Sequence, residues 1–154
     1  MSSPANHVMH GYFIGDSPVT DDLSGIEKNG PIKASDPPSP DSCYGVSKAF
    51  GEDLGRYYSL LHGIQFVALR IGWAAPRFAP EWIDRTNKPL TDHFRVMFVS
   101  RRDHSDAFDK AIQVDIPCMV PYAVSNNKPA VFDMSEAREI MNFHPVDDSE
   151  TYFG

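Results

Sequence analysis

The chain has 154 residues and a formal net charge of −7, from 14 basic and 21 acidic side chains. Its hydrophobic content of 42% is ordinary for a folded domain and too high for a disordered chain. The acidic balance argues against a nucleic-acid or anionic-membrane partner, since phosphate binding needs clustered Lys and Arg. No apolar run has the roughly 20 residues of a membrane span. Cys43 and Cys118 are too few for a disulfide framework or a four-ligand zinc site. We expect one soluble, cytoplasmic domain without a metal site.

Residues 11–42 have the composition of a loop. They hold four of the ten glycines and five of the thirteen prolines, and neither a helical nor a strand period runs through them. We predict a long surface loop, because long loops within compact domains are usually functional or mobile. A flexible N-terminal tail is the alternative.

The strongest periodic pattern lies between Tyr44 and His62 and predicts a helix. Its apolar stripe, which we expect in the core, consists of Val46, Phe50, Leu54 and Leu61, with Tyr57 on the same face. Gly63 follows where a left-handed residue ends a helix, and Asp41 or Ser42 can cap the start. Glycine inside a helix costs about 1 kcal/mol, so we expect the two interior glycines, Gly51 and Gly55, to approach a neighbouring backbone.

The apolar run at 64–72 predicts a strand buried on both faces, as in parallel sheets. Helix, turn and strand together make half of a βαβ crossover, so the fold class is α/β. Further along the chain we expect a loop at 73–89, helices at 90–100 and 103–114, a strand at 118–124 and a short helix at 134–141. Asp103 is the expected cap of the second of these helices.

Tyr44 and Lys48 form a Tyr-x-x-x-Lys pattern at the start of the predicted helix. Residues four apart share a helix face, with Cβ atoms roughly 5–6 Å apart. An ammonium beside a phenol stabilises the phenolate, so the pair can serve as a general base for a substrate hydroxyl. The pattern alone also occurs by chance on solvated helix faces.

Several segments together resemble one family. They are SSPANHV (2–8), YGVSKAFGEDLGRYY (44–58), LRIGW (69–73), FRVMFVSRRD (94–103), YAVSNN (122–127) and FHPVDDSE (143–150). In this order they resemble the extended short-chain dehydrogenase/reductases, in the branch of uronate dehydrogenase and the archaeal NAD-dependent sugar dehydrogenases. YGVSKAFGED is the most specific of them. The resemblance implies a Rossmann-like fold and NAD-dependent oxidation of a sugar or sugar acid.

The resemblance also implies roles for individual residues. Tyr44 resembles the catalytic proton acceptor and Lys48 the lysine that orients the nicotinamide ribose. Ser3 is the candidate for the family serine, although Pro4 and Ala5 separate it from the Asn-His pair and a plain terminal or capping serine is the alternative.

Further residues are implied to contact the substrate and the cofactor. Asn6 and His7 match positions that contact substrate oxygens. Arg95 matches the arginine that pairs with the carboxylate of a uronate, a role that suits a guanidinium fork. The segment implied to approach the nicotinamide consists of Ile71, Gly72 and Trp73.

The glycine-rich turn of a dinucleotide-binding fold does not occur in the chain. No three glycines stand at G-x-G-x-x-G spacing, and no N-terminal strand precedes such a turn. We therefore expect residues 1–154 to form the C-terminal part of such a domain, an incomplete Rossmann-like fold without its N-terminal dinucleotide-binding half. Truncation, gene splitting or an incorrect start would each produce it. NAD or NADP would then bind only where the missing half is supplied.

Two other functions stay open. One is a sugar-nucleotide epimerase or dehydratase of the same family, which uses the same Tyr and Lys. The other is a non-catalytic remnant or interaction module that binds no cofactor. The resemblance further implies a homodimer that pairs through the helix at 44–62.

Overall fold

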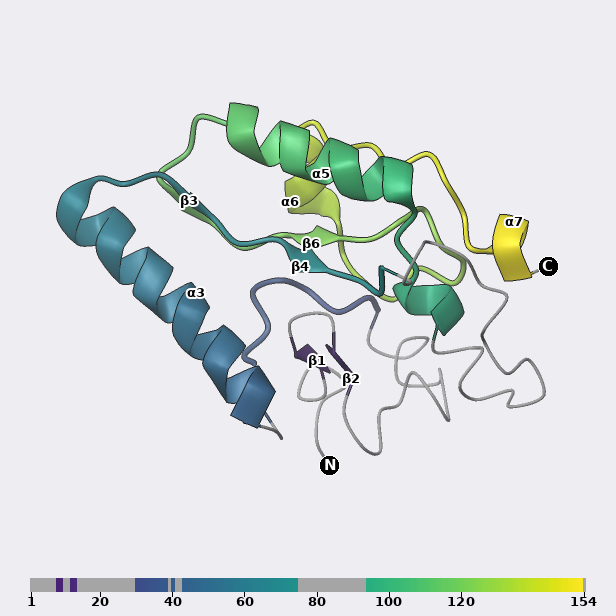
Figure 1. Cartoon of the computed structure of the whole chain (residues 1–154), viewed down its shortest axis with the longest axis horizontal. Helices are drawn as coiled ribbons and strands as arrows, with labels where there is room; N and C mark the ends of the chain where they lie inside the picture. Colours follow the sequence, from purple (N-terminus) through teal and green to yellow (C-terminus); the bar gives the residue numbers. More distant parts are fainter. Residues whose placement is uncertain are drawn as a thin grey trace.

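The computed structural model describes residues 8–9, 12–13, 30–38, 40, 43–74 and 94–153. In chain order its elements are β1 (Val8–Met9), β2 (Tyr12–Phe13), α3 (Cys43–His62), β3 (Phe66–Val67), β4 (Arg70–Ile71), α5 (Arg101–Gln113), β5 (Cys118–Met119), β6 (Tyr122–Ala123), α6 (Ser135–Glu139) and α7 (Glu150–Phe153). Figure 1 shows the two long helices, α3 and α5, on opposite sides of the short strands β3 to β6. The α/β class predicted from the sequence is confirmed.

The helix predicted at 44–62 is α3. It ends as predicted at Gly63, which has a φ of +65°. The N–H of Gly63 donates to the carbonyl of Ser59 at 2.9 Å, which closes the last turn. The predicted capping residues, Asp41 and Ser42, lie outside the described residues.

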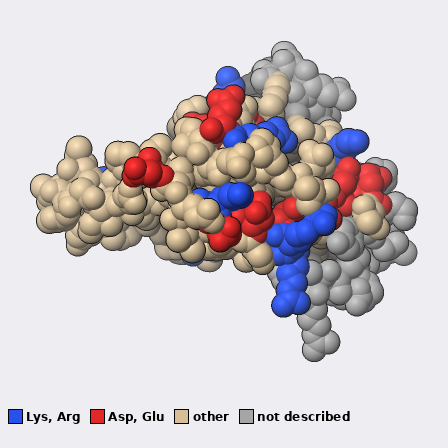
Figure 2. Space-filling view, turned by 90° about the horizontal axis from the view of Figure 1, so that it is seen from above, with Lys and Arg blue, Asp and Glu red and all other residues tan. Residues whose placement is uncertain are grey.

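The face of α3 that is buried is not the predicted one. Its buried residues are Gly45, Glu52 and Ser59, which recur every seven positions along one side. The apolar stripe is exposed instead, with the Phe50 side chain 65% accessible, so the prediction of a core stripe is wrong; the other exposed members are Val46, Leu54, Tyr57 and Leu61. Figure 2 shows the end of the molecule where α3 meets β3 as a largely uncharged projection.

Small and polar residues are buried because α3 lies close against the strands. An added Cβ at Gly55 would come within 2.3 Å of several ring carbons of Phe66, so only glycine admits the ring there. No described atom lies within 4 Å of a Cβ built on Gly51. The expectation of a neighbouring backbone is therefore wrong at both glycines: a side-chain ring lies against Gly55, and Gly51 has open space.

Four of the strands form two consecutive parallel pairs, β3 with β5 and β4 with β6, and β1 pairs with β2 in antiparallel orientation. The N–H groups of Phe66, Ala68, Arg70 and Gly72 donate in turn to the carbonyls of Pro117, Met119, Pro121 and Ala123, at 2.9–3.2 Å. Helix α5 lies between β4 and β5 in the chain and so connects the first strand of each pair to the second, which makes a βαβ crossover. The half-crossover predicted from the helix at 44–62 and the strand at 64–72 corresponds to α3 followed by β3 and β4. The strand predicted at 64–72 is half-buried for most of its length, because its neighbours cover its faces only in part.

The segment before α5 differs from its prediction. Residues 94–97 are helical, but Phe98 is extended and pairs with Trp73 in a parallel bridge, so the predicted helix at 90–100 is too long. The N-cap of α5 is Ser100, whose hydroxyl accepts from the N–H of Asp103 at 3.0 Å. Asp103 therefore does not cap the helix. It is buried, and its carboxylate accepts hydrogen bonds from the N–H groups of Val146 and Asp147.

The hydrophobic core lies mainly in the second half of the chain. Its buried members are Ile32, Val96, Met97, Ala107, Met119, Tyr122, Ala123, Val124, Val131, Phe132, Met134, Ala137, Met141 and Phe143. Ile32, from the predicted loop at 11–42, joins them because it pairs with Phe132 in a parallel bridge. None of the helices in the described ranges has the length and hydropathy needed to cross a bilayer.

Candidate active site

A cleft of about 540 Å³ opens between α3 and the strands β3 and β4. The helix side is lined by Tyr44, Ser47, Lys48, Gly51 and Glu52, and the strand side by Phe66, Ala68, Leu69, Ile71 and Gly72. The open space at Gly51 is part of this cleft. The first three turns of α3 therefore face the whole strand segment from Phe66 to Gly72 across this cleft. The carboxyl ends of parallel strands are where α/β folds commonly bind ligands.

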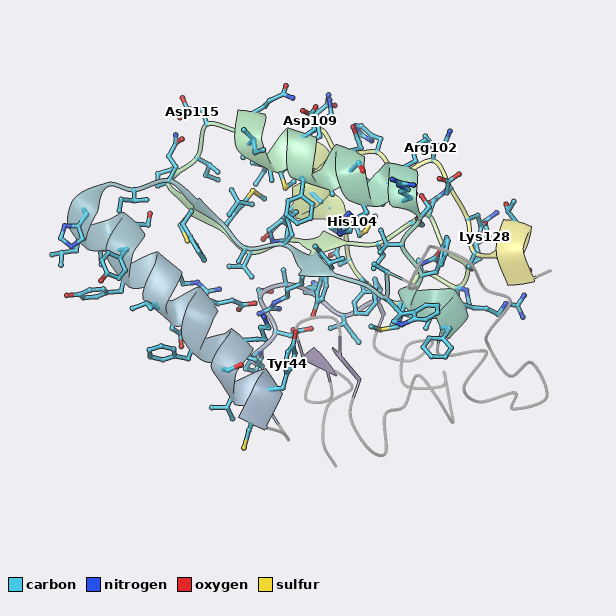
Figure 3. All side chains as sticks on the ribbon, viewed as in Figure 1. Tyr44, Arg102, His104, Asp109, Asp115 and Lys128 are labelled. Atoms are coloured by element: carbon cyan, nitrogen blue, oxygen red, sulfur yellow. The ribbon has the colours of Figure 1, made fainter. Side chains whose placement is uncertain are left out.

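Tyr44 and Lys48 meet at the cleft as their spacing predicts. The Lys48 Nζ lies 5.0 Å from the centre of the Tyr44 ring, and both residues are exposed. In Figure 3 Tyr44 lies at the first turn of α3, on the side of the strands. The hydroxyl of Ser47 donates to the Tyr44 carbonyl at 2.6 Å within the same turn. A phenol and an ammonium are thus presented together to the cleft.

Of the three residues expected at a nicotinamide, Ile71 and Gly72 line the cleft. A Cβ on Gly72 would lie 2.1 Å from the carbonyl oxygen of Met97, so glycine is required there by packing. Trp73 is held differently: its N–H donates to Met97, its carbonyl accepts from Val99, and its ring stacks on Phe94 at 4.0 Å. The described contacts of Trp73 are therefore with other parts of the fold, and Trp73 is not among the residues that line the cleft.

A buried ion pair joins the two walls of the cleft. Arg70 donates from Nε to Oε1 of Glu52 and from NH2 to Oε2, both at 2.9 Å, and each side chain is 5% exposed. The NH1 of Arg70 also donates to the Ala34 carbonyl at 3.1 Å, and the guanidinium lies over the Tyr122 ring. Burial raises the pKa of Tyr122 to about 12, although the nearby Arg70 charge opposes the shift.

Sequence reasoning did not identify this pair as functional. Two signals were present: Arg70 interrupts an otherwise apolar strand, and Glu52 follows Lys48 by one helical turn. A charged residue inside a buried strand needs a partner, and the helix side of a βαβ unit is where one can be found.

Arg95, the residue matched to a carboxylate-binding arginine, has a carboxylate partner within the chain. Its Nε donates to Oε1 of Glu150 at 3.1 Å, and NH2 contacts the same oxygen. Both side chains are partly exposed. Ser3, Asn6 and His7 lie outside the described residues. Over the ranges that are described, no three His, Cys, Asp or Glu side chains are grouped to hold a metal ion.

The parallel βαβ unit and the Tyr-x-x-x-Lys cleft define part of a Rossmann-like α/β domain. The structure superposes on a mutated uronate dehydrogenase with a TM-score of 0.66 and 28% identity, over 79% of this chain and 40% of that one. Uronate dehydrogenase from Agrobacterium tumefaciens gives a TM-score of 0.66 and 26% identity, over 79% and 42%. No family model matches the chain.

Curated relatives agree with the structural comparison. The chain is 33% identical over 149 residues to L-arabinose 1-dehydrogenase (NAD(P)(+)) of Haloferax volcanii, covering 95% of this chain and 58% of the relative. It is 30% identical over 148 residues to NAD-dependent glucose-6-phosphate dehydrogenase of the same organism, covering 96% and 53%. The chain is therefore related to the sugar and uronate dehydrogenases of the extended short-chain type, as its motifs predict, and it spans about half the length of the curated relatives it matches.

Proposed function

We propose that this chain carries the catalytic cleft of an NAD-dependent oxidoreductase that oxidises a sugar or a sugar acid. The observation that carries the proposal is the placement of Tyr44 and Lys48 together in a cleft whose other wall is a parallel strand. The names of the relatives, all dehydrogenases of sugars or uronates, support this reaction class.

In the proposed reaction a sugar carbinol becomes a carbonyl. The Tyr44 phenolate takes the proton of the substrate hydroxyl while the hydride leaves the same carbon. Lys48, beside the ring, stabilises the phenolate before the transfer and keeps the phenol oriented afterwards. The nicotinamide, when bound, accepts the hydride and becomes NADH. Ser3 is proposed as a second hydroxyl donor to the substrate oxygen, and Asn6 and His7 as contacts to other sugar oxygens.

The described residues fit only one end of NAD. The ammonium of Lys48 and the hydroxyls of Tyr44 and Ser47 suit the hydroxyls of a ribose, and Leu69 and Ile71 offer an apolar wall to a ring. The sequence has no glycine-rich turn for the pyrophosphate. We therefore propose that NAD or NADP binds when a nucleotide-binding half completes the domain.

Arg95 is proposed as a contact to an anionic group of the substrate. Because Glu150 already engages its guanidinium, a substrate carboxylate has to displace an internal one.

We place the enzyme in the cytoplasm and propose that it forms a homodimer through α3. Cys43 and Cys118 are both free, which agrees with a reducing compartment. The exposed apolar stripe of α3 suits a dimer interface, since a second copy would cover it.

The test is an assay of NADH formation with L-arabinose, glucose 6-phosphate and glucuronate. It uses a chimera in which the first part of the Haloferax L-arabinose 1-dehydrogenase, up to the segment that matches this chain, precedes Met1. We expect NADH from at least one substrate and a loss of about 100- to 10,000-fold in kcat for Tyr44→Phe.

Three results would contradict the proposal. A chimera that binds NAD but forms no NADH from any of the three sugars is not a dehydrogenase of this class. Conversion of a sugar nucleotide without net NADH would identify an epimerase. Unchanged turnover of Tyr44→Phe would remove Tyr44 as the base.

A further inference from the structure

We propose that Glu52 and Arg70 are positioning residues that set the place of Tyr44 and Lys48 in the cleft, an inference that rests on the proposed function. The two charges lie on opposite walls: Glu52 is on α3 and Arg70 on β4. Glu52 itself lines the cleft, and Arg70 directly precedes Ile71 and Gly72, which line it too. One ion pair therefore connects the element that carries the phenol to the element that faces it.

The geometry of the pair fixes the relative orientation of the Glu52 and Arg70 side chains as well as the distance between them. Two parallel hydrogen bonds of 2.9 Å, from Nε and NH2 to the two oxygens of one carboxylate, hold both planar groups in one orientation. A third donor of Arg70, NH1, is directed to the Ala34 carbonyl. Both side chains are almost fully buried, so water does not compete for these bonds.

The pair is also a polar attachment of α3 close to the dyad. Lys48 is one helical turn before Glu52, and Tyr44 is two turns before it. The next attachment along the helix is Ser59, whose hydroxyl donates to the Pro117 carbonyl at 2.6 Å, almost two turns after Glu52. The Glu52–Arg70 pair therefore resists a rotation of the first turns of α3.

The alternative is a purely structural pair, which would stabilise the fold without affecting the dyad. The two roles make different predictions for the position of the Tyr44 ring. Ser59→Ala provides the control, because it removes another polar attachment of the same helix, a single hydrogen bond, at a greater distance from Tyr44.

The test is NMR spectroscopy of the chain itself, with carbon-13 in the tyrosine rings. The Tyr44 signal is assigned by its loss in Tyr44→Phe, and its proximity to Lys48 is followed by the nuclear Overhauser effect between the two side chains. We expect Glu52→Gln and Arg70→Lys to shift the Tyr44 ring resonance by more than its linewidth and to weaken this effect at least twofold. Ser59→Ala should lower the unfolding temperature and leave the Tyr44 signal in place.

Exchanging the charges of Glu52 and Arg70 tests whether a restored ion pair returns Tyr44 to its original position. The double variant Glu52→Arg, Arg70→Glu should return the Tyr44 resonance toward its original position. Glu52→Asp, which keeps the charge and shortens the side chain, serves if Glu52→Gln does not fold. An unchanged Tyr44 signal in the folded single variants, or an equal shift in Ser59→Ala, would overturn the proposal.

A kinetic measurement on the chimera distinguishes failure of this proposal from failure of the proposed function. In the chimera, Arg70→Lys should lower kcat about tenfold and change KM less than twofold, because the substrate contacts remain and the base is displaced. If the unaltered chimera never forms NADH, the proposed function fails, whereas the NMR result still decides whether the pair positions Tyr44.

Discussion

The two sides of this molecule are built in different ways. Residues 94–150 contain all but one of the buried core side chains, and the Asp103 carboxylate accepts from Val146, Asp147 and Ser125 within this region. Helix α3 contributes none of those core residues. Its described attachments to the strands are the Glu52–Arg70 pair, the contact of Gly55 with Phe66 and the Ser59 hydrogen bond.

The difference separates the part of the chain that supplies most of the buried core from the helix that carries the candidate site. The tightly packed region holds the ends of the strands in place, and a helix with a few specific attachments brings Tyr44 and Lys48 to them. Regions with few buried apolar contacts open at a lower free-energy cost than the core. The candidate site therefore lies at the boundary between a stable body and a helix that polar contacts orient.

The largest expected effect comes from a matched pair of phenylalanines. Phe143 is 0% exposed in the core, and Phe50 is 65% exposed on α3. At protein concentrations low enough to keep the chain monomeric, Phe143→Ala should lower the free energy of unfolding by about 3–5 kcal/mol, whereas Phe50→Ala should change it by less than about 0.5 kcal/mol. Urea denaturation of both variants measures the difference. A large loss for Phe50→Ala would show that the α3 stripe is covered in solution, as in a homodimer.

The second prediction concerns the buried carboxylate of Asp103. Asp103→Ala removes the acceptor of the Val146 and Asp147 N–H groups and of the Ser125 hydroxyl, so the free energy of unfolding should fall by about 3 kcal/mol. Amide hydrogen exchange should become faster at residues 144–150 before it does in β5 and β6. Equal acceleration across all of these residues would contradict a local role for Asp103.

The third prediction uses the two glycines inside α3. Gly55→Ala forces a methyl group against the Phe66 ring and should cost about 1–3 kcal/mol. Gly51→Ala meets no described atom and should stabilise the helix by up to about 1 kcal/mol. Thermal unfolding of the two variants should therefore show shifts of opposite sign. Shifts of the same sign would mean that α3 is not held against Phe66.

The smallest expected effect is the pH dependence of Asp133. Its carboxylate accepts from the hydroxyl and the N–H of Ser135, and these bonds hold the pKa of Asp133 below its usual value. The stabilisation is therefore fully present above the unfolded pKa of about 4 and is lost as the pH falls through the folded value. Asp133→Ala should cost about 1 kcal/mol at neutral pH and less in acid. Urea denaturation of both proteins at neutral and at acid pH measures the loss of stability. A loss that is larger in acid than at neutral pH would contradict the prediction.

The sequence predicted what depends on local spacing. The helix at 44–62, its end at Gly63, the parallel βαβ order and the shared face of Tyr44 and Lys48 all follow from periodicity and turn chemistry. Periodicity also identified the apolar stripe of α3, but it cannot tell which face of a helix meets a neighbour. The features that the sequence did not predict depend on partners that are distant in sequence. Ile32 pairs with Phe132, and Arg70 pairs with Glu52. Asp103 binds the segment that follows residue 144.

The ladder between residues 66–72 and 117–123 has one more consequence. Because alternate N–H groups of a strand are directed to opposite sides, those of Val67, Leu69 and Ile71 are directed away from β5 and β6. They recur at intervals of roughly 7 Å along the outer rim, which is the repeat an incoming extended segment requires. The bonds to β5 and β6 therefore use one set of N–H groups of this segment, and the N–H groups of residues 67, 69 and 71 form a second set on the opposite rim.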